Sequence, residues 1–216
     1  MQKCERPLLI LGTRTLAVEI ADVASDIPGV HLAGFVENQD RDRCRQPLEG
    51  LPVYWVEDLG RMKDSHCVVG GLATTRRNIF IEQAAAQEME FATLIHPSAR
   101  VSNKAHVGAG AIVSAGCLVS AYSRLGCHVF LNRGVLIGHH TEIGDFSTLQ
   151  PGANIAGCCH IAEHAYIGMG AIIVDNITIG ACSFISAASL VTKDVPSHVQ
   201  VFGVPAKVIR ESRNGK

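Results

Sequence analysis

Residues 135–149 read VLIGHHTEIGDFSTL and decide the fold of this chain. They place three large aliphatic side chains six residues apart, and this spacing continues without a miss from Ile95 to Val191. Neither the helical period nor the alternating period of a strand puts an aliphatic residue only at every sixth position. A fixed hexapeptide period is typical of a parallel β-helix, in which each repeat forms one flat side of a coil. The seventeen aliphatic positions are Ile95, Val101, Val107, Val113, Val119, Leu125, Leu131, Ile137, Ile143, Leu149, Ile155, Ile161, Ile167, Ile173, Ile179, Ile185 and Val191.

Three hexads complete one coil, so residues 18 positions apart are expected to stack on neighbouring coils at about 4.8 Å, the spacing of paired strands. Small residues dominate two positions before each aliphatic residue, and together the large and small side chains fill a thin core. The same rule predicts an outer column of polar side chains, which we interpret as a structural charge ladder. Its members are His106, Arg124, Glu142, His160 and Thr178.

The residues before the hexads follow a different pattern. Short apolar runs such as Pro7–Leu11 and His31–Val36 alternate with amphipathic stretches such as Leu16–Ala24. Alternation of this kind predicts a small doubly wound parallel sheet with helices on its faces. The chain is therefore expected to have two domains, with the change near residue 95.

Composition narrows the function. The chain carries 19 basic and 20 acidic residues. It has no run of basic residues that could bind along the phosphate backbone of a nucleic acid, so we expect no nucleic-acid partner. No stretch of 18 apolar residues and no leader-like start are present in the sequence, so we expect a cytoplasmic protein without membrane insertion. The eight cysteines are scattered, and we interpret them as buried, reduced thiols.

The hexads, with Gly203–Lys207 after them, resemble the left-handed β-helix (hexapeptide-repeat) acyltransferases. Over about residues 7–210 the chain is more narrowly similar to bacterial sugar acetyltransferases, the family of sialic acid O-acetyltransferases and nucleotide-aminosugar N-acetyltransferases. This resemblance implies a small α/β Rossmann-like, nucleotide-sugar-binding domain at 1–94. It implies an all-β left-handed parallel β-helix that carries the acyltransferase chemistry at 95–202, and a C-terminal tail at 203–216. It also implies a homotrimer that uses acetyl-CoA as cosubstrate.

The resemblance places His139 at the family's general base. Imidazole, with an unperturbed pKa of about 6.5, is suited to take a proton from an amino sugar that attacks a thioester. His140 stands where the family has an acidic orienting residue, and it is either a second catalytic residue that orients His139 or a neutral spacer. Either Glu142 or Asp145 could replace the acid, or the base is weaker than in the family. Stacking puts Gly157, 18 residues after His139, in position to donate a backbone N–H to the developing oxyanion.

The expected coenzyme contacts lie along the β-helix and at its end. The expected substrate contacts lie in the front domain, apart from Asn132 of the β-helix. The expected acyl-CoA-binding residues are Thr148, which replaces a family histidine near the thioester, Gly157, Met169, Ala187 and Lys207. The expected substrate-binding residues are Gly12, Arg14, Thr15, Glu37, Asn38, Gly71 and Asn132. The loop after the first strand could place backbone N–H groups and a helix N-terminus against phosphate.

These residues lead to a hypothesis of an acetyl-CoA-dependent N-acetyltransferase of a nucleotide-linked amino sugar in bacterial surface-glycan biosynthesis. O-acetylation of a sialic acid-like sugar is the alternative within the family. A catalytically degenerate, trimeric nucleotide-sugar-binding protein is the alternative from another class, because His140, Thr148 and Thr15 depart from the family pattern. We expect no metal site, since Gly152 and Gly157 stand where the zinc histidines of γ-class carbonic anhydrases would be.

Overall fold

The computed structural model describes residues 6–211, apart from the side chain of Arg76. The chain divides into two compact units, and the boundary lies between Leu94 and Ile95. The short segment Thr74–Arg76 groups with the second unit.

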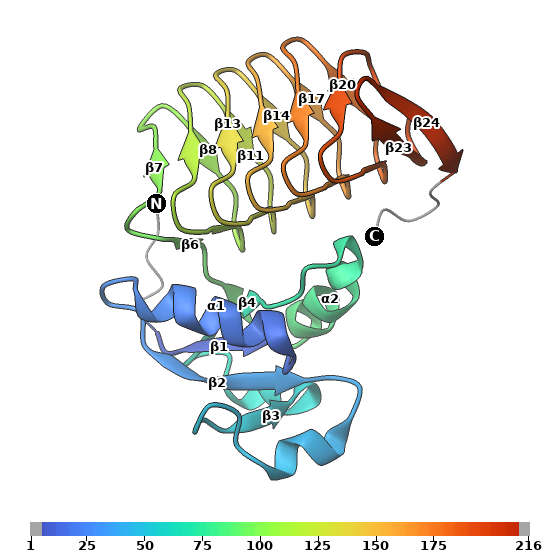
Figure 1. Ribbon diagram of the computed structural model, residues 1–216. Helices are drawn as coiled ribbons and strands as arrows, with labels where there is room; N and C mark the ends of the chain where they lie inside the picture. The colour runs from blue at the N-terminus through green and yellow to red at the C-terminus, as the bar shows by residue number, and fades with distance from the viewer. Residues whose placement is uncertain (1–5, 212–216) are drawn as a thin grey trace. The chain divides into compact units, whose positions relative to one another are not determined.

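The front unit contains a five-stranded sheet in the order β3-β2-β1-β4-β5, in which every pairing is parallel (Figure 1). The parallel sheet predicted from the alternating segments is therefore present. Its central strand is the most apolar and is completely buried. The elements are β1 (Leu8–Leu11), α1 (Thr15–Ser25), β2 (Leu32–Glu37), η1 (Arg41–Arg45), β3 (Val53–Trp55), η2 (Val56–Arg61), β4 (Cys67–Gly70), η3 (Thr75–Arg77), α2 (Asn78–Ala86) and β5 (Glu90–Phe91).

The hexads form a parallel β-helix of two-residue strands, and each aliphatic position is the second residue of its strand (Figure 1). The strands are β6 (Leu94–Ile95), β7 (Arg100–Val101), β8 (His106–Val107), β9 (Ile112–Val113), β10 (Leu118–Val119), β11 (Arg124–Leu125), β12 (Phe130–Leu131), β13 (Leu136–Ile137), β14 (Glu142–Ile143), β15 (Thr148–Leu149), β16 (Asn154–Ile155), β17 (His160–Ile161), β18 (Tyr166–Ile167), β19 (Ile172–Ile173), β20 (Thr178–Ile179), β21 (Phe184–Ile185) and β22 (Leu190–Val191).

Strand pairing follows the predicted 18-residue rule. Ile137 pairs with Ile155 and Ile155 pairs with Ile173, and the other coils repeat this register. Every third strand joins the same sheet, so the coil has three faces. We call them the six-stranded face (β22-β19-β16-β13-β10-β7), the five-stranded face (β20-β17-β14-β11-β8) and the eight-stranded face (β24-β23-β21-β18-β15-β12-β9-β6).

The aliphatic side chains point inward and make one continuous core. Ile137, Ile161 and Ile173 are fully buried within it, and small residues such as Ala153 and Ala171 fill the spaces between them. Each buried aliphatic side chain contributes roughly 1.5–3 kcal/mol of transfer free energy. The core therefore holds the turns, where polar side chains stand, at fixed positions.

The C-terminal residues extend the β-helix. β23 (Val199–Gly203) pairs parallel with β21, and β24 (Ala206–Glu211) returns antiparallel along β23. A domain boundary at residue 202 therefore falls inside a strand, and the residues from 203 to 211 belong to the eight-stranded face. The last five residues of the expected tail lie outside the described part of the chain.

The cysteines only partly match the expectation of buried, reduced thiols. Cys67 is disulfide-bonded and Cys158 is exposed, so that expectation is wrong for these two residues. Burial raises the pKa of the Cys117 thiol to about 11, and burial also raises the pKa of Cys159. Within residues 6–211 no helix is long and apolar enough to cross a membrane.

Candidate active site

The turn that carries His139 lies between β13 and β14, where the six-stranded face meets the five-stranded face. The coils on both sides hold its backbone. The N–H of His140 donates to the carbonyl of Ala121 over 3.1 Å, and the carbonyl of His139 accepts from the N–H of Cys158 over 2.8 Å. The exposed imidazole of His139 thus stands on a fixed backbone. We call this edge of the coil the His139 corner.

Gly157 lies against the ring of His139. A Cβ atom added to Gly157 would come within 2.8 Å of Cε1 and 2.9 Å of Nε2 of His139, so only glycine leaves the ring where it is. Gly138 allows the backbones of the two coils to approach, because a Cβ atom there would lie 2.5 Å from the Gly157 nitrogen. The predicted stacking of an imidazole and a glycine on neighbouring coils is confirmed. The use of the Gly157 N–H as an oxyanion donor stays a prediction.

His139 and His140 meet through their Nδ1 atoms, which are 3.1 Å apart. The two rings are nearly perpendicular, with 84° between their planes. Between two neutral imidazoles one nitrogen must donate and the other accept. When His139 donates, its Nε2 keeps a lone pair and can take a proton. When His139 accepts, its Nε2 carries hydrogen and cannot act as a base.

Three further side chains of the His139 corner were not singled out from the sequence. Tyr122 stacks on His140 with 4.9 Å between ring centroids, and the ammonium of Lys104 donates to the Tyr122 hydroxyl over 3.1 Å. The exposed thiol of Cys158 lies 4.0 Å from Nδ1 of His139. The 18-residue rule contains the signal for all of them, because Lys104, Tyr122, His140 and Cys158 are spaced 18 apart.

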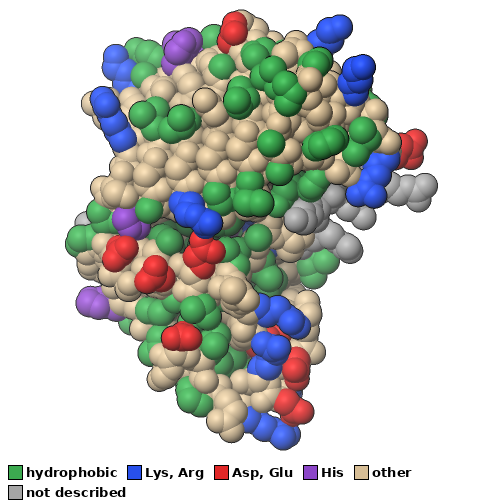
Figure 2. Space-filling view, viewed as in Figure 1, with side chains coloured by type: hydrophobic (Ala, Val, Ile, Leu, Met, Phe, Trp, Pro, Cys, Tyr) green, Lys and Arg blue, Asp and Glu red, His purple; other side chains and the backbone are tan. Residues whose placement is uncertain are grey.

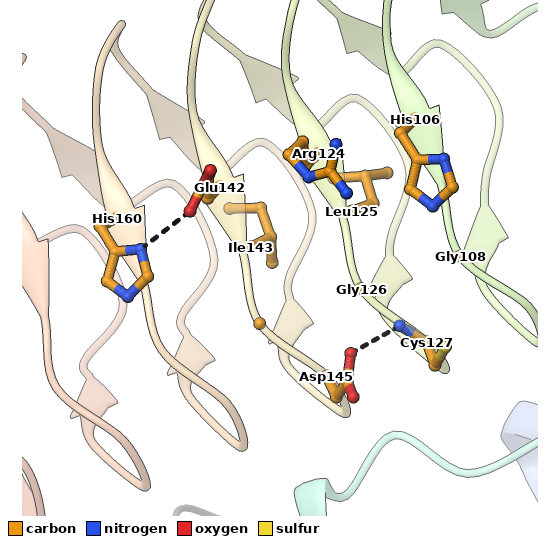
Figure 3. A pocket seen from close by; sticks show the side chains of 11 residues that line it. His106, Gly108, Arg124, Leu125, Gly126, Cys127, Glu142, Ile143, Asp145 and His160 are labelled. Carbon is orange, nitrogen blue, oxygen red and sulfur yellow. Dashed lines mark hydrogen bonds and ion pairs between the residues drawn. The ribbon is translucent and has the colours of Figure 1, made fainter.

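The two carboxylates that could have replaced the family's acid bind elsewhere. Glu142 points along the five-stranded face to His160, with 3.4 Å between Oε2 and Nδ1 (Figure 3). Asp145 accepts from the backbone N–H of Cys127 over 2.7 Å (Figure 3). Both residues line a shallow cavity of about 300 Å³ on that face. The alternative in which Glu142 or Asp145 orients His139 is therefore wrong for this structure, and the charge-ladder interpretation of Glu142 is supported by its contact with His160.

Several expected ligand contacts lie away from the His139 corner. Asn132, Met169 and Ala187 stand at the turns between the eight-stranded and six-stranded faces, which we call the Met169 corner. Met169 is 56% exposed, whereas Asn132 is buried and its amide donates to Gln150 over 3.4 Å. One chain therefore does not bring the residues of the two corners together.

Thr148 and Lys207 lie on the eight-stranded face. Thr148 is fully buried on β15, where Phe130 and Tyr166 are its strand neighbours. Its hydroxyl is not accessible to a ligand in this structure, so the expectation that Thr148 contacts the thioester is not supported by its position. Lys207 is exposed on β24 opposite Phe202.

In the front unit, the residues at the ends of β1 and β2 form a polar cluster. The buried carboxylate of Glu37 accepts from the Thr13 hydroxyl and from the N–H groups of Asn38 and Gln39, at 2.9 and 2.8 Å. Burial alone would raise the pKa of Glu37, but these hydrogen bonds outweigh it and lower the pKa. Arg43 donates to the Thr13 carbonyl over 3.3 Å and lines a cavity of about 410 Å³ beside the cluster.

Both Thr13 and Arg43 were missed in the sequence. Thr13 lies between Gly12 and Arg14, which were predicted to bind the substrate. Arg43 lies in a polar segment without a distinctive pattern. Asn38 is half-buried, and its amide donates to Gln83 over 2.7 Å.

Gly12 and Gly71 meet at the start of α1. A Cβ atom on Gly71 would lie 2.6 Å from Ile10 and 3.1 Å from Ala17, and one on Gly12 would lie 3.2 Å from the Gly71 carbonyl. Both glycines therefore allow close packing of α1 against the strand ends. Arg14 and Thr15 are exposed at the N-terminus of this helix, where no side chain caps the backbone. This leaves the helix N-terminus able to receive an anion.

Among residues 6–211 no group of three or more His, Cys, Asp or Glu side chains is arranged to hold a metal ion. No protein-family model matches the chain. A GDP-perosamine N-acetyltransferase of Escherichia coli O157:H7 is 34% identical over 125 residues, which are 56% of this chain and 57% of that protein. The chain spans about half the length of the curated relatives it matches.

Solved structures match over both units. PerB from Caulobacter crescentus, in complex with CoA and GDP-perosamine, has a TM-score of 0.86 and 28% identity, and covers 94% of this chain and 97% of its own. The acetyltransferase domain of PglB from Neisseria gonorrhoeae FA1090, in complex with acetyl coenzyme A, has a TM-score of 0.88 and 28% identity, with coverage of 94% and 99%.

Proposed function

Because the chain belongs to the hexapeptide-repeat, left-handed β-helix family of sugar acetyltransferases, we propose that it transfers an acetyl group from acetyl-CoA to the amine of a nucleotide-linked sugar. The observation that carries this proposal is the position of the His139 ring against Gly157 on the next coil. An imidazole beside a glycine backbone supports acyl transfer to an amine, because this reaction needs a base and a donor for the oxyanion.

The proposed reaction is a direct transfer. The amine nitrogen attacks the thioester carbon, and Nε2 of His139 takes the proton that the nitrogen loses. The N–H of Gly157 stabilises the oxyanion of the tetrahedral intermediate. The intermediate then collapses, the carbon–sulfur bond breaks, and the sulfur leaves with its electron pair and receives a proton from His139. An amide and free CoA are the products, and His139 returns to its starting state.

Room for the acceptor lies next to His139. A cavity of about 490 Å³ opens on the coils before it, with Ser120 and Ala121 among its lining residues. These two residues stand 18 positions before Gly138 and His139. A sugar held there would present its amine to the imidazole from the preceding coil.

We propose that the complete site forms between two copies of the chain in a homotrimer. The family resemblance assigns the coenzyme to both the His139 corner and the Met169 corner, which are different edges of one coil. A coenzyme can touch both edges only when they come from neighbouring copies. Apolar side chains exposed on the six-stranded face between these corners support this arrangement, since Leu136 is 40% and Ile172 is 46% exposed. Figure 2 shows hydrophobic side chains among the backbone of the β-helix, with Lys and Arg mainly near its margins.

For the front unit we propose a Rossmann-like, nucleotide-sugar-binding role. Its parallel sheet ends in the Thr13–Glu37–Arg43 cluster, and the N-terminus of α1 begins beside it. Polar groups at the carboxyl ends of parallel strands, next to a helix N-terminus, suit a nucleotide with its phosphates. Since PerB binds GDP-perosamine, an amino sugar linked to a nucleoside diphosphate is the preferred acceptor class. The proposed reaction belongs to bacterial surface-glycan biosynthesis and takes place in the cytoplasm, where acetyl-CoA and nucleotide sugars are made.

The test follows free thiol release from acetyl-CoA in the presence of a panel of nucleotide-linked amino sugars and of sialic acid-like sugars as hydroxyl acceptors, for the wild type and for His139→Gln. We expect release with at least one amino sugar, and a loss of roughly 10²- to 10⁴-fold in the variant. Release that His139→Gln leaves unchanged would contradict the assignment of the base. Release only with a hydroxyl acceptor would favour O-acetylation. Tight binding of nucleotide sugars without release would favour the binding-protein alternative, which the absence of an acid at residue 140 motivates.

A further inference from the structure

One edge of the β-helix carries an uninterrupted column of stacked polar side chains, one from each of three successive coils. The Lys104 ammonium lies 5.1 Å from the ring centre of Tyr122, and the Tyr122 ring lies 4.9 Å from that of His140, with 29° between the planes. His140 in turn touches His139 through the pair of Nδ1 atoms. The column therefore ends on the side chain that we propose as the base.

Within residues 6–211, no carboxylate forms a hydrogen bond or ion pair with this column. Asp175, whose turn lies two coils from that of His139, accepts from the side-chain amide of Asn176 over 2.7 Å. The titratable and charged members of the column are Lys104, Tyr122, His140 and His139, and the thiol of Cys158 adjoins His139. The carboxylates of Glu142 and Asp145 are engaged on the five-stranded face. The place of an anion that would fix the tautomer of His139 is thus taken by an imidazole ring.

We propose that Tyr122 is a positioning residue for the base: its ring holds the neutral imidazole of His140 so that His140 Nδ1 accepts the hydrogen of His139 Nδ1. This inference rests on the proposed function for its meaning in catalysis, but the arrangement itself is a property of the protein without substrate. The accepted hydrogen bond leaves Nε2 of His139 unprotonated, as a general base requires.

Geometry explains why the stack is needed. A carboxylate has two equivalent oxygens and can accept in many orientations, whereas a neutral imidazole accepts at one nitrogen only. Rotation of the His140 ring out of its plane would turn Nδ1 away from His139 and break the contact. Stacking on Tyr122 holds that plane, because offset parallel rings are the favoured arrangement for aromatic side chains, and within the plane the contact with His139 selects the edge that carries Nδ1.

The experiment reads the tautomer directly. The protein is labelled with ¹⁵N-histidine, and two-bond ¹⁵N–¹H correlations identify which nitrogen of His139 carries hydrogen, with His139→Gln to assign the signal. The pH is set where both rings are neutral. Three proteins are compared: the wild type, Tyr122→Phe, which keeps the stacked ring, and Tyr122→Leu, which removes it. The thermal unfolding midpoint of each shows whether the fold is kept.

We expect hydrogen on Nδ1 of His139 in the wild type and in Tyr122→Phe, and a mixture of both tautomers in Tyr122→Leu. In the thiol-release assay Tyr122→Leu should lose roughly 10- to 100-fold in kcat, and Tyr122→Phe should retain most of it. Hydrogen on Nε2 of His139 in the wild type, or the same tautomer in all three proteins, would overturn the inference. Absence of thiol release with every acceptor would contradict the proposed function. The tautomer measurement would still test the role of Tyr122, because it needs no substrate.

Discussion

At the scale of single residues, the missing side chain of Gly157 matters as much as the imidazole it faces. We expect Gly157→Ala to lower kcat/KM by roughly 100-fold, because the added Cβ atom would lie 2.8 Å from the His139 ring and displace it. The backbone of Gly157 does not have the positive φ that favours glycine, so the thermal unfolding midpoint should change little. A Gly157→Ala variant with normal kcat/KM would show that activity does not require the position of the His139 ring beside Gly157.

The neutral partner of His139 predicts a particular pH dependence. Replacing His140 by Glu puts a carboxylate beside His139 and favours its protonated form, so the acid limb of the kcat/KM profile should move to higher pH. His140→Gln adds no charge and should leave the limb where it is. The polar groups next to this pair, the Lys104 ammonium and the Tyr122 phenol, are the same in both variants. An acid limb that stays in place in His140→Glu would mean that another group controls the profile.

The 18-residue rule was sufficient to place His139 against Gly157 from the sequence, because strand register in a β-helix fixes which turns are neighbours. It was not sufficient for contacts that depend on side-chain direction. The sequence allowed Glu142 to be a partner of His139, but in the structure the Glu142 side chain points to His160. Tyr122 obeys the rule but carries no catalytic group of its own, so nothing in the sequence drew attention to it.

At the scale of elements, β11, β14, β17 and β20 each have one exposed and one buried residue, and β17 tests that division. Ile161→Ala should lower the free energy of unfolding by about 2–5 kcal/mol, because Ile161 is fully buried in the core of the coils. His160→Ala on the same strand should cost less than about 1 kcal/mol, since its ion pair with Glu142 is exposed. Chemical denaturation followed by far-ultraviolet circular dichroism, at one protein concentration, measures both. Equal losses would contradict the assignment of inward and outward positions.

In the front unit, the end of β2 depends on an ionised carboxylate. The pKa of Glu37 is lowered from its ordinary value of 4.5. Its ionised form therefore stabilises the fold above pH 4.5, and this contribution is lost as the pH falls through the lower, folded-state pKa. Glu37→Gln should cost about 1–3 kcal/mol at neutral pH and less under acid conditions. Fluorescence of Trp55, the single tryptophan, follows the unfolding. A cost that does not shrink with acid would show that charge is not the cause.

Element positions were predictable where a period governs them. The hexads gave the strands β6–β22, since an aliphatic residue at every sixth position leaves only one register. The C-terminal hairpin was not foreseen as part of the eight-stranded face, because β24 runs antiparallel and leaves the period. The polar cluster of Thr13, Glu37 and Arg43 could be predicted only in part, because Arg43 reaches it from η1, whose sequence has no repeating pattern.

At the scale of the whole molecule, the proposed homotrimer predicts complementation between two inactive variants. His139→Ala damages the His139 corner, and Met169→Arg places bulk and charge on the exposed Met169 corner. Each homotrimer should have low activity, but mixed trimers should contain sites in which both corners are intact. Random mixing makes about a quarter of the sites competent. Co-expression followed by the thiol-release assay measures this recovery. No recovery in verified mixed trimers would indicate that each site lies within one chain.

The most direct measurement is a crystal structure of the protein with CoA and a nucleotide-linked amino sugar. The account predicts the coenzyme sulfur beside the N–H of Gly157, the sugar nitrogen within hydrogen-bonding distance of Nε2 of His139, and a neighbouring copy's Met169 corner along the coenzyme. A complex in which the sulfur and the sugar nitrogen meet on another face, with His139 in contact only with solvent, would contradict it.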